Sequence, residues 1–265
     1  MPRNQESTTS SSSAIRFPER QSLPGSAGRN TPAIVAALQP HLVHLAEQKS
    51  EGGGKAVRVL ELASGTGEHV AAFAQESGST HRFVYQPTEA DEWLCSQIAL
   101  NASRARGNGN NENIILPPQI LDLTDSKDWD KIRRTQQGSE NGDEDDDKAA
   151  APFDAIFAFN LLHITPFEVT HSIFQQLDPE RAGSPPMLHQ MHGFIAFYGA
   201  FKEHEYDELS EGNAKFDADI RSRNSSFGIR SVDSVRQVAD LHGHRLAERI
   251  AMPSNNWILI FRPKR

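Results

Sequence analysis

Short apolar stretches alternate along the chain with stretches in which apolar residues recur at helical spacing. Five apolar stretches predict strands, at 57–62, 82–86, 119–123, 153–159 and 193–198. The segments between them predict helices, at 68–75, at 91–106, from Asp125 and at 166–177. This alternation predicts a doubly wound α/β fold, with a parallel sheet and helices on both faces.

The C-terminal third follows a different pattern. Residues 216–223 and 231–242 predict helices, and 245–251 and 257–262 predict a hairpin around the turn 252–256. A five-stranded parallel core followed by an antiparallel hairpin gives a seven-stranded, mostly parallel sheet. This Rossmann-like layout is typical of class I methyltransferases rather than of nicotinamide dehydrogenases.

The N-terminal part divides into a tail and a helix. Residues 1–14 are rich in Ser and Thr and almost free of apolar side chains, so we expect a disordered tail before a domain at 15–265. Thr31 and Pro32 predict a helix start, with Thr31 as the N-cap and Pro32 at the first helical position. Apolar residues follow at helical spacing from Ile34 to Leu45.

Two insertions interrupt the alternation. The loop 135–150 carries six acids and one lysine, hence a local charge of -5 out of the net charge of -8, and the simplest interpretation is a solvated loop. The second insertion, 179–190, is rich in proline. With 27 basic and 35 acidic residues, the composition argues against a nucleic-acid partner.

The remaining composition narrows the class of protein. The single cysteine, Cys95, excludes an intrachain disulfide and a cysteine zinc cluster. Neither a membrane-spanning apolar run nor an N-terminal apolar stretch is present, so we expect no membrane partner and no signal peptide. We therefore expect a cytoplasmic protein, with a nuclear location as the alternative.

The strongest motif runs from Glu61 through Ala63, Ser64 and Gly65 to Gly67, where a predicted strand gives way to a helix. Glycines there allow a tight turn and a close ligand approach, and backbone N–H groups at the helix start favour an anion. A dinucleotide fingerprint requires a third glycine, but this chain has valine at that position. An acid ahead of the glycines instead suits the cationic amino-acid end of S-adenosylmethionine.

Two further acids follow successive predicted strands. Glu89 comes 22 residues after Gly67, where an acid commonly binds ribose hydroxyls, and Asp122 with Leu123 stands where a carboxylate and a backbone N–H can read adenine. An exposed loop glutamate and a helix-capping aspartate are the plainer alternatives. All these residues fall at carboxyl ends of strands, where open α/β sheets bind ligands.

The chain resembles the DUF938 (UPF0585) family from about residue 27 to its end. The resemblance rests on these segments of the chain: 29–34, 59–69, 86–89, 121–123, 159–164, 198–199, 213–217, 228–230 and 252–256. It implies an S-adenosylmethionine-dependent methyltransferase fold but no particular substrate. The chain departs from the family pattern at Glu89, usually Asp, at Ala200, usually Pro, and at Phe227, often Trp.

The predicted acceptor side begins after the fourth strand, with Asn160 and His163 as candidate catalytic residues. Methyl transfer needs a positioned nucleophile and removal of its proton, and an imidazole titrates near neutrality. A His that bridges its loop, and an Asn that holds the loop or the methionine end of the cofactor, remain open. Tyr198, at the end of the fifth strand, is a candidate for lining the substrate pocket.

Several other polar residues are candidates for binding. Arg29 and Asn30, before the first predicted helix, would close over the cofactor, and Asn213, Asp217 and Arg230 would bind substrate. Each arginine can instead pair with a nearby acid. His189 and His192 lack a third ligand, so we predict no metal site, and we assign the three tryptophans to packing.

Together these features predict an S-adenosylmethionine-dependent methyltransferase that acts on a small-molecule O or N acceptor. One alternative is a non-catalytic protein that binds the cofactor or a partner on the same fold. A nicotinamide enzyme is the second alternative. The sequence does not indicate an oligomeric state.

Overall fold

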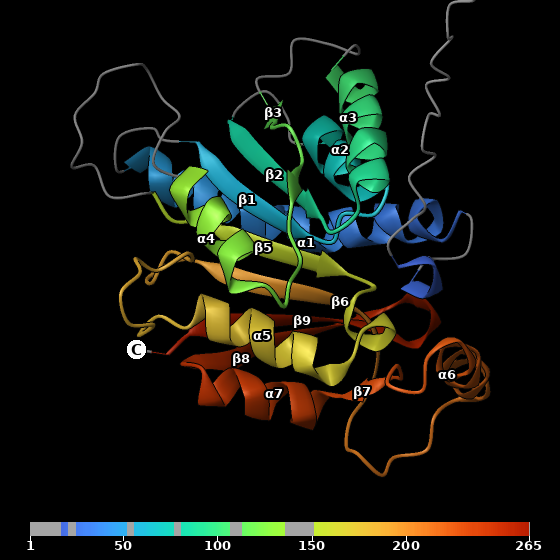
Figure 1. The fold of residues 1–265 in the computed structure, drawn as a ribbon. Coiled ribbons are helices and arrows are strands. Elements are labelled where there is room, and N and C mark those ends of the chain that lie inside the picture. The colour runs from blue at the N-terminus through green and yellow to red at the C-terminus, as the bar shows by residue number, and fades with distance from the viewer. Residues whose placement is uncertain are drawn as a thin grey trace, which may run out of the picture.

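The computed structural model describes residues 17–20, 25–51, 56–76, 81–106, 113–135 and 151–264. These residues form a nine-stranded sheet. Its strand order is β3-β2-β1-β5-β6-β9-β8, and β4 pairs with β2 and β7 with β6 (Figure 1). The predicted tail and all but the first residue of the acidic loop lie outside the described residues. No helix of the described part is long and apolar enough to cross a membrane.

The sheet is mostly parallel, as predicted. Its parallel strands are β1 (Val57–Leu62), β2 (Phe83–Glu89), β3 (Ile114–Ile115), β4 (Gln119–Ile120), β5 (Ala155–Phe159), β6 (Phe194–Lys202) and β7 (Arg230–Ser231). The hairpin consists of β8 (His244–Met252) and β9 (Asn256–Pro263), and β9 runs antiparallel to both β6 and β8. The seven strands of the main path therefore confirm the predicted fold class.

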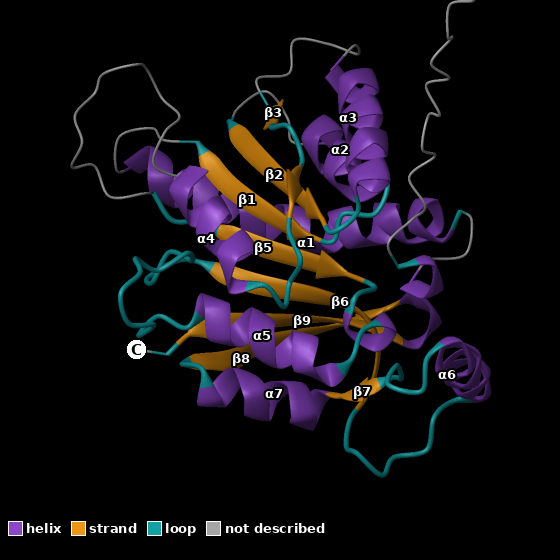
Figure 2. Cartoon of the chain, in the orientation of Figure 1, coloured by secondary structure: helices purple, strands orange, loops and turns teal. Residues whose placement is uncertain are grey.

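Helices cover both faces of the sheet (Figure 2). One face carries α1 (Ser26–Glu51), α2 (Glu68–Glu76) and α3 (Glu92–Arg106), and the other carries α4 (Ser126–Thr135), α5 (Phe167–Leu177) and α7 (Val232–Leu241). The remaining α-helix, α6 (Glu211–Arg223), covers neither face and lies beyond the carboxyl end of β6 (Figure 1). Three short 3-10 helices complete the chain: η1 (Pro18–Arg20), η2 (Leu162–Ile164) and η3 (Pro253–Asn255).

Alternation along the strands divides the core into two clusters. In β5 all five residues are buried. Ile156 and Ala158 join the cluster under α4, α5 and α7, whereas Phe157 and Phe159 join the cluster under α1 and α2. Successive side chains of a strand point to opposite faces, so a strand with helices on both sides must be apolar throughout.

The helix start predicted at Thr31 is wrong. Helix α1 begins at Ser26, and Pro32 lies inside it. The Thr31 hydroxyl donates back to the carbonyl of Ala27 at 2.8 Å instead of capping the helix. An internal proline forfeits a helix hydrogen bond, but α1 buries Ile34 and further apolar residues against the sheet. Packing has therefore overridden the local signal.

Two predicted strands also differ from the structure. The third, 119–123, is only the short β4, after a separate short β3. The fifth extends from Phe194 to Lys202, because β9 pairs with it as far as Ala200. Tyr198 therefore lies within the strand and not at its end.

The proline-rich insertion contributes to the core. Phe153 and Leu188 form a parallel bridge, and Met187 and Leu188 are buried beside α5.

Candidate functional site

A cavity of about 540 Å³ lies at the carboxyl ends of β1, β2, β4 and β5, where open α/β sheets bind ligands. Its walls also include η1 and the first turns of α1, α2 and α3. Eight of the predicted site residues line it: Glu61, Ala63, Ser64, Gly65, Glu89, Asp122, Leu123 and Asn160. The structure therefore brings together residues that span about a hundred positions of the sequence.

The loop after β1 has the backbone of a tight ligand-binding turn. Ala63, Gly65 and Gly67 all have positive φ, at 51°, 59° and 80°. Asn160, after β5, is also left-handed, with φ 55°. Non-glycine residues in this conformation carry strain, and such strain often marks a functional site.

The backbone N–H groups of this loop are already engaged within the protein. Ser64 donates to the carbonyl of Thr88 at 2.8 Å, Gly67 to that of Ser64 at 2.9 Å, and Gly65 to the Glu89 carboxylate at 2.9 Å. The sequence predicted that N–H groups here favour an anion, but these three are not available to one. A pyrophosphate would therefore find few donors in this turn.

Gly67 serves packing rather than the cavity. A Cβ at this position would lie 3.1 Å from the Ile98 Cα of α3, so only glycine lets the two segments approach. Gly67 does not line the cavity. The structure thus places this predicted cofactor-binding residue behind the loop.

Glu61, the last residue but one of β1, is the most deeply buried acid of the cavity, with 3% of its surface exposed. Burial, with a smaller contribution from the neighbouring Glu89, raises the pKa of its carboxyl to about 8. Its Oε2 has no hydrogen-bond partner. A buried carboxyl that lacks a partner is a ready acceptor for a ligand with a positive charge.

His69 stands beside Glu61, in the first turn of α2. Its Nδ1 lies 4.0 Å from the Glu61 Oε1, its ring centroid lies 4.9 Å from that of Phe159, and its Nε2 has no hydrogen-bond partner. Burial lowers the pKa of the imidazole to about 4, so the ring is neutral at physiological pH. The sequence analysis assigned no role to His69, although it directly follows the glycine loop.

Glu89 is the last residue of β2 and is held in place by the backbone. Its Oε2 accepts from the N–H of Gly65, and its Oε1 accepts from the N–H of Ala90 at 2.8 Å. Burial raises the pKa of the carboxyl, and the two backbone hydrogen bonds oppose that shift. Each oxygen keeps a second lone pair, so the carboxylate can still accept two hydroxyl groups.

Asp122 lies in the turn after β4. Its Oδ1 accepts from the N–H of Thr124 at 3.0 Å and from the Thr124 hydroxyl at 2.7 Å, and its own N–H donates to the Asp128 carboxylate at 3.0 Å. The carboxylate therefore shapes the turn as well as lining the cavity. The Leu123 carbonyl accepts from the indole of Trp129 at 3.0 Å, which fixes the same turn from behind.

The cavity is strongly acidic. Among the described residues that line it, five are acids and one is a permanent cation, Arg20 of η1. The acids are Glu61, Glu68, Glu89, Asp91 and Asp122. Such a site attracts cations and repels phosphates.

Three further residues that the sequence did not predict, Phe17, Arg20 and Trp93, line the cavity. Phe17 and Arg20 come from the segment before α1, and the Arg20 guanidinium lies 3.8 Å from the Phe17 ring centroid. Trp93, 41% exposed, stands at the cavity wall, so the assignment of all three tryptophans to packing was wrong. Its position four residues after Glu89, at the start of a helix that follows a strand end, was the available signal.

The predicted lid residues lie outside the cavity. Arg29 is exposed and Asn30 half-buried, and neither lines the walls. Instead Gly25, Ser26 and Ala27 do, because α1 begins earlier than predicted.

His163 does not line the cavity either. The residue is 5% exposed, and its ring meets the Phe216 ring edge-on at 5.0 Å. Burial, with a smaller contribution from Arg230, lowers the pKa of the imidazole to about 4. Tyr198 is buried in the core of the α1 face, where burial raises the pKa of its phenol to about 12.

Asp217 and Arg230 are engaged with the protein itself. Asp217 accepts from the N–H of Ile229 and from Arg221, each at 2.6 Å. Arg230 donates to the carbonyls of Leu162 at 3.2 Å and Thr165 at 2.7 Å. These contacts fasten α6 and β7 to η2, as in the alternative interpretation that each arginine serves structure.

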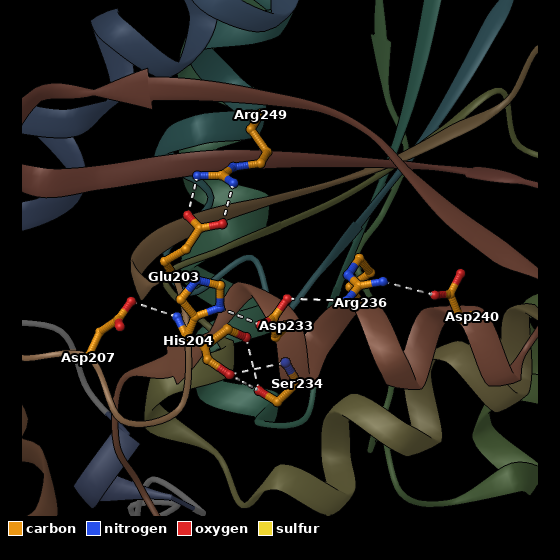
Figure 3. Close-up of polar contacts among 9 residues, drawn as sticks. Glu203, His204, Asp207, Asp233, Ser234, Arg236, Asp240 and Arg249 are labelled. Atoms are coloured by element: carbon orange, nitrogen blue, oxygen red, sulfur yellow. Dashed lines mark hydrogen bonds and ion pairs between the residues drawn. The ribbon is translucent and has the colours of Figure 1, made fainter.

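Asn213 lines a second, smaller cavity of about 290 Å³ near the end of β6. Beside it runs a network of ion pairs, drawn in Figure 3. Arg249 holds Glu203 with two N–H groups, one at 2.6 Å, and His204 contacts Asp233 at 2.6 Å. Glu203, one of the acids that line this cavity, is therefore paired with a cation.

Comparison with known proteins identifies a family. A family model described as "Protein of unknown function (DUF938)" matches residues 21–263. The match covers nearly the whole chain, and its description assigns no activity.

Solved structures share the fold at low identity. The mitomycin 7-O-methyltransferase MmcR has a TM-score of 0.53 and 12% identity over 78% of this chain and 49% of that chain. A pericyclic reaction enzyme has a TM-score of 0.53 and 12% identity, over 80% and 44%. The LepI complex with SAM has a TM-score of 0.51 and 13% identity, over 80% and 44%. The chain thus spans about half the length of the proteins that it resembles.

Proposed function

The chain belongs to the DUF938 family, and from the cavity of this member we propose that it is an S-adenosylmethionine-dependent methyltransferase with a small-molecule O or N acceptor. One observation carries the proposal. Three N–H groups of the glycine loop, those of Ser64, Gly65 and Gly67, are occupied, and five acids line the cavity around the loop. This combination suits a nucleoside with a cationic tail and disfavours a dinucleotide.

The cavity fits such a cofactor in size and in chemistry. Its volume of about 540 Å³ lies within the usual range of small-molecule sites. The buried, unpartnered Oε2 of Glu61 fits the cofactor's ammonium group. Glu89, fixed by two backbone N–H groups, fits the ribose hydroxyls, and the turn of Asp122 and Leu123 fits the adenine.

When bound, the cofactor supplies an electrophilic methyl group on its sulfonium. The protein's task is then to hold the acceptor in line and to exclude water. Phe159 and Asn160, at the end of β5, form the wall between the glycine loop and η2. Asn160 keeps its predicted place at the methionine end, where its amide can orient the acceptor.

We do not assign the base to His163. A catalytic base must reach the proton that it removes, and His163, within η2, is buried against Phe216 and does not line the cavity. For the same reason Tyr198, Asp217 and Arg230 are not assigned to the acceptor, whereas Asn213 keeps a place beside the second cavity. A small-molecule acceptor is supported by the likeness to a mitomycin O-methyltransferase.

A non-catalytic cofactor-binding protein is the second candidate. Likeness to a pericyclic reaction enzyme favours keeping it, because the fold alone does not specify methyl transfer.

Calorimetric titration tests the proposal. We expect wild-type protein to bind S-adenosylmethionine and S-adenosylhomocysteine with micromolar Kd and to ignore NAD. Glu89→Ala should weaken both by about tenfold, or about 1.4 kcal/mol, and Glu92→Ala, an exposed acid of α3 outside the cavity, should leave them unchanged. Binding of NAD alone would favour the nicotinamide enzyme, and binding of none of the three would remove the proposal.

A further inference from the structure

Two neighbouring side chains of the large cavity each carry an unpartnered polar atom. Within the described residues, Oε2 of Glu61 and Nε2 of His69 are both buried and without a hydrogen-bond partner. The two side chains also face each other, with Nδ1 of His69 4.0 Å from Oε1 of Glu61. This separation is too long for a hydrogen bond, so the pair leaves acceptor capacity unused.

Unused capacity of this kind opposes folding. An unsatisfied buried polar group costs about 1–3 kcal/mol, and here two occur side by side. Packing does not require either group, because the His69 ring rests on Phe159 at 4.9 Å, a contact that a phenyl ring would also make. A polar ligand that supplies hydrogen-bond donors accounts for both atoms at once.

The charge of the pair indicates which ligand group binds there. His69 is neutral at physiological pH, because burial holds its pKa at about 4, so one ring nitrogen is an acceptor. Glu61 brings the negative charge once a cation is bound: its pKa of about 8 keeps the carboxyl protonated at pH 7 without ligand, and a nearby cation favours the ionised form. A cation with several N–H donors can donate to a carboxylate and to a neutral imidazole at the same time. A second carboxylate in place of His69 would add like-charge repulsion with Glu61, and a protonated histidine there would repel the cation.

We propose that His69 and Glu61 together bind the α-ammonium group of the cofactor, with the carboxylate as the charged acceptor and the imidazole as the neutral one. The inference rests on the proposed function and adds His69 to the site. In this arrangement the ammonium donates to the Glu61 carboxylate and to a ring nitrogen of His69, two groups that approach to 4.0 Å. His69 is therefore a specificity-determining residue for the amino-acid end of the ligand.

Three ligands with the same adenosine separate the possible contacts of His69. S-adenosylhomocysteine carries ammonium and carboxylate, its decarboxylated analogue carries only ammonium, and 5′-methylthioadenosine carries neither. Three variants complete the set: His69→Phe keeps the ring packing without a nitrogen, His69→Gln places an amide oxygen near the position of Nε2, and His44→Ala is a control on the exposed face of α1.

We expect His69→Phe to weaken S-adenosylhomocysteine and its decarboxylated analogue by roughly tenfold or more, the size of one hydrogen bond to a charged group. Binding of 5′-methylthioadenosine should change by less than about twofold, because its contacts are those of the adenosine alone. His69→Gln should recover part of the lost affinity, and His44→Ala should match wild type. Thermal unfolding of each ligand-free variant shows that it is folded.

The remaining outcomes are distinct. Equal weakening of all three ligands would show a structural role for His69 and overturn the proposal. Weakening of S-adenosylhomocysteine but not of its decarboxylated analogue would assign His69 to the carboxylate and overturn it as well. If folded wild-type protein binds none of the ligands, the proposed function itself fails, whereas wild-type binding with an unaffected His69→Phe rejects only the role of His69.

Discussion

The two halves of the sheet's carboxyl edge treat buried polar groups in opposite ways. At the end of β1 and in the first turn of α2, Glu61 and His69 have polar atoms without partners. Around η2, α6 and β7, the polar side chains have partners within the protein. Asp217 accepts from Arg221 and from a backbone N–H, and Arg230 donates to backbone carbonyls. Both halves bury titratable groups, so burial alone does not identify a site. A missing partner points to a ligand only where the residue also lines a cavity, as Glu61 and His69 do, because Nε2 of His244 lacks a partner too but lines neither cavity.

The largest effect should come from Glu61→Gln. Loss of the carboxylate, which a bound ammonium keeps ionised, should weaken binding of S-adenosylhomocysteine roughly 100- to 1,000-fold, about 3–4 kcal/mol. Without ligand, the free energy of unfolding of the same variant should exceed that of the wild type by about 1–3 kcal/mol at pH 7. The folded pKa of Glu61 is about 8 against an ordinary 4.5, so the native state holds a proton that the unfolded state releases, and stability falls as pH rises between these values.

Calorimetry and urea unfolding at pH 7 measure the two effects of Glu61→Gln. A variant that lost both affinity and stability would show that Glu61 supports the fold, and the contrast between the two regions would disappear.

The opposite result is expected from Arg230→Met. Removal of the guanidinium leaves the carbonyls of Leu162 and Thr165 without their donor, which should lower the free energy of unfolding by about 2–3 kcal/mol. Affinity for S-adenosylhomocysteine should stay within about threefold of wild type. Urea unfolding and calorimetry on the same preparation check this, and a large loss of affinity in a stable protein would return Arg230 to the ligand site.

The two glycines of the loop should separate packing from the cavity. Gly67→Ala should destabilise by about 2 kcal/mol, because its φ is positive and a Cβ would press on Ile98 at 3.1 Å. Gly65→Ala meets nothing within 4 Å and should lose only the strain of its left-handed backbone, about 1 kcal/mol. Since Gly65 lines the cavity, its variant should also bind more weakly. Thermal unfolding with and without ligand compares the two variants. Equal stability losses would contradict the assignment of Gly67 to packing and of Gly65 to the cavity.

The smallest effect concerns pH and should be the same in both regions. His69 and His163 have folded pKa values of about 4, below the ordinary 6.5, so the native state binds fewer protons and stability is lost as pH falls from 6.5 toward 4. Lowering the pH from 7 to 6 should cost about 0.7 kcal/mol per histidine by linkage. His69→Gln and His163→Gln should each remove one such increment in urea unfolding, and an unchanged pH dependence would contradict the burial of that ring as a neutral group.

Much of the fold was predictable because its signals are local. Apolar runs identified β1, β5 and the hairpin, and the glycine loop marked the turn from β1 to α2. Glu89 and Asp122 were found for one reason, namely that each stands where a strand ends and strand ends meet at one edge. The start of α1 was not predictable, because its burial against the sheet outweighs Pro32.

The residues that sequence missed depend on contacts between distant segments. Phe17 and Arg20 reach the cavity only because the chain before α1 folds across it. Tyr198 lies in the core rather than at a strand end, because β9 pairs with β6 beyond the predicted end of that strand. His69 belongs to a helix rather than a strand end, and its significance follows from the missing partner of its Nε2, which no sequence pattern records.

The most direct test of the account is a crystal structure of the full chain with S-adenosylhomocysteine. We predict adenosine at Glu89 and Asp122, and the ammonium nitrogen within hydrogen-bond distance of both the Glu61 carboxylate and the His69 ring. The unpartnered side chains of Glu61 and His69 would then both have a partner. An amino-acid end directed away from this pair, with Glu61 and His69 still unpartnered, would contradict the account.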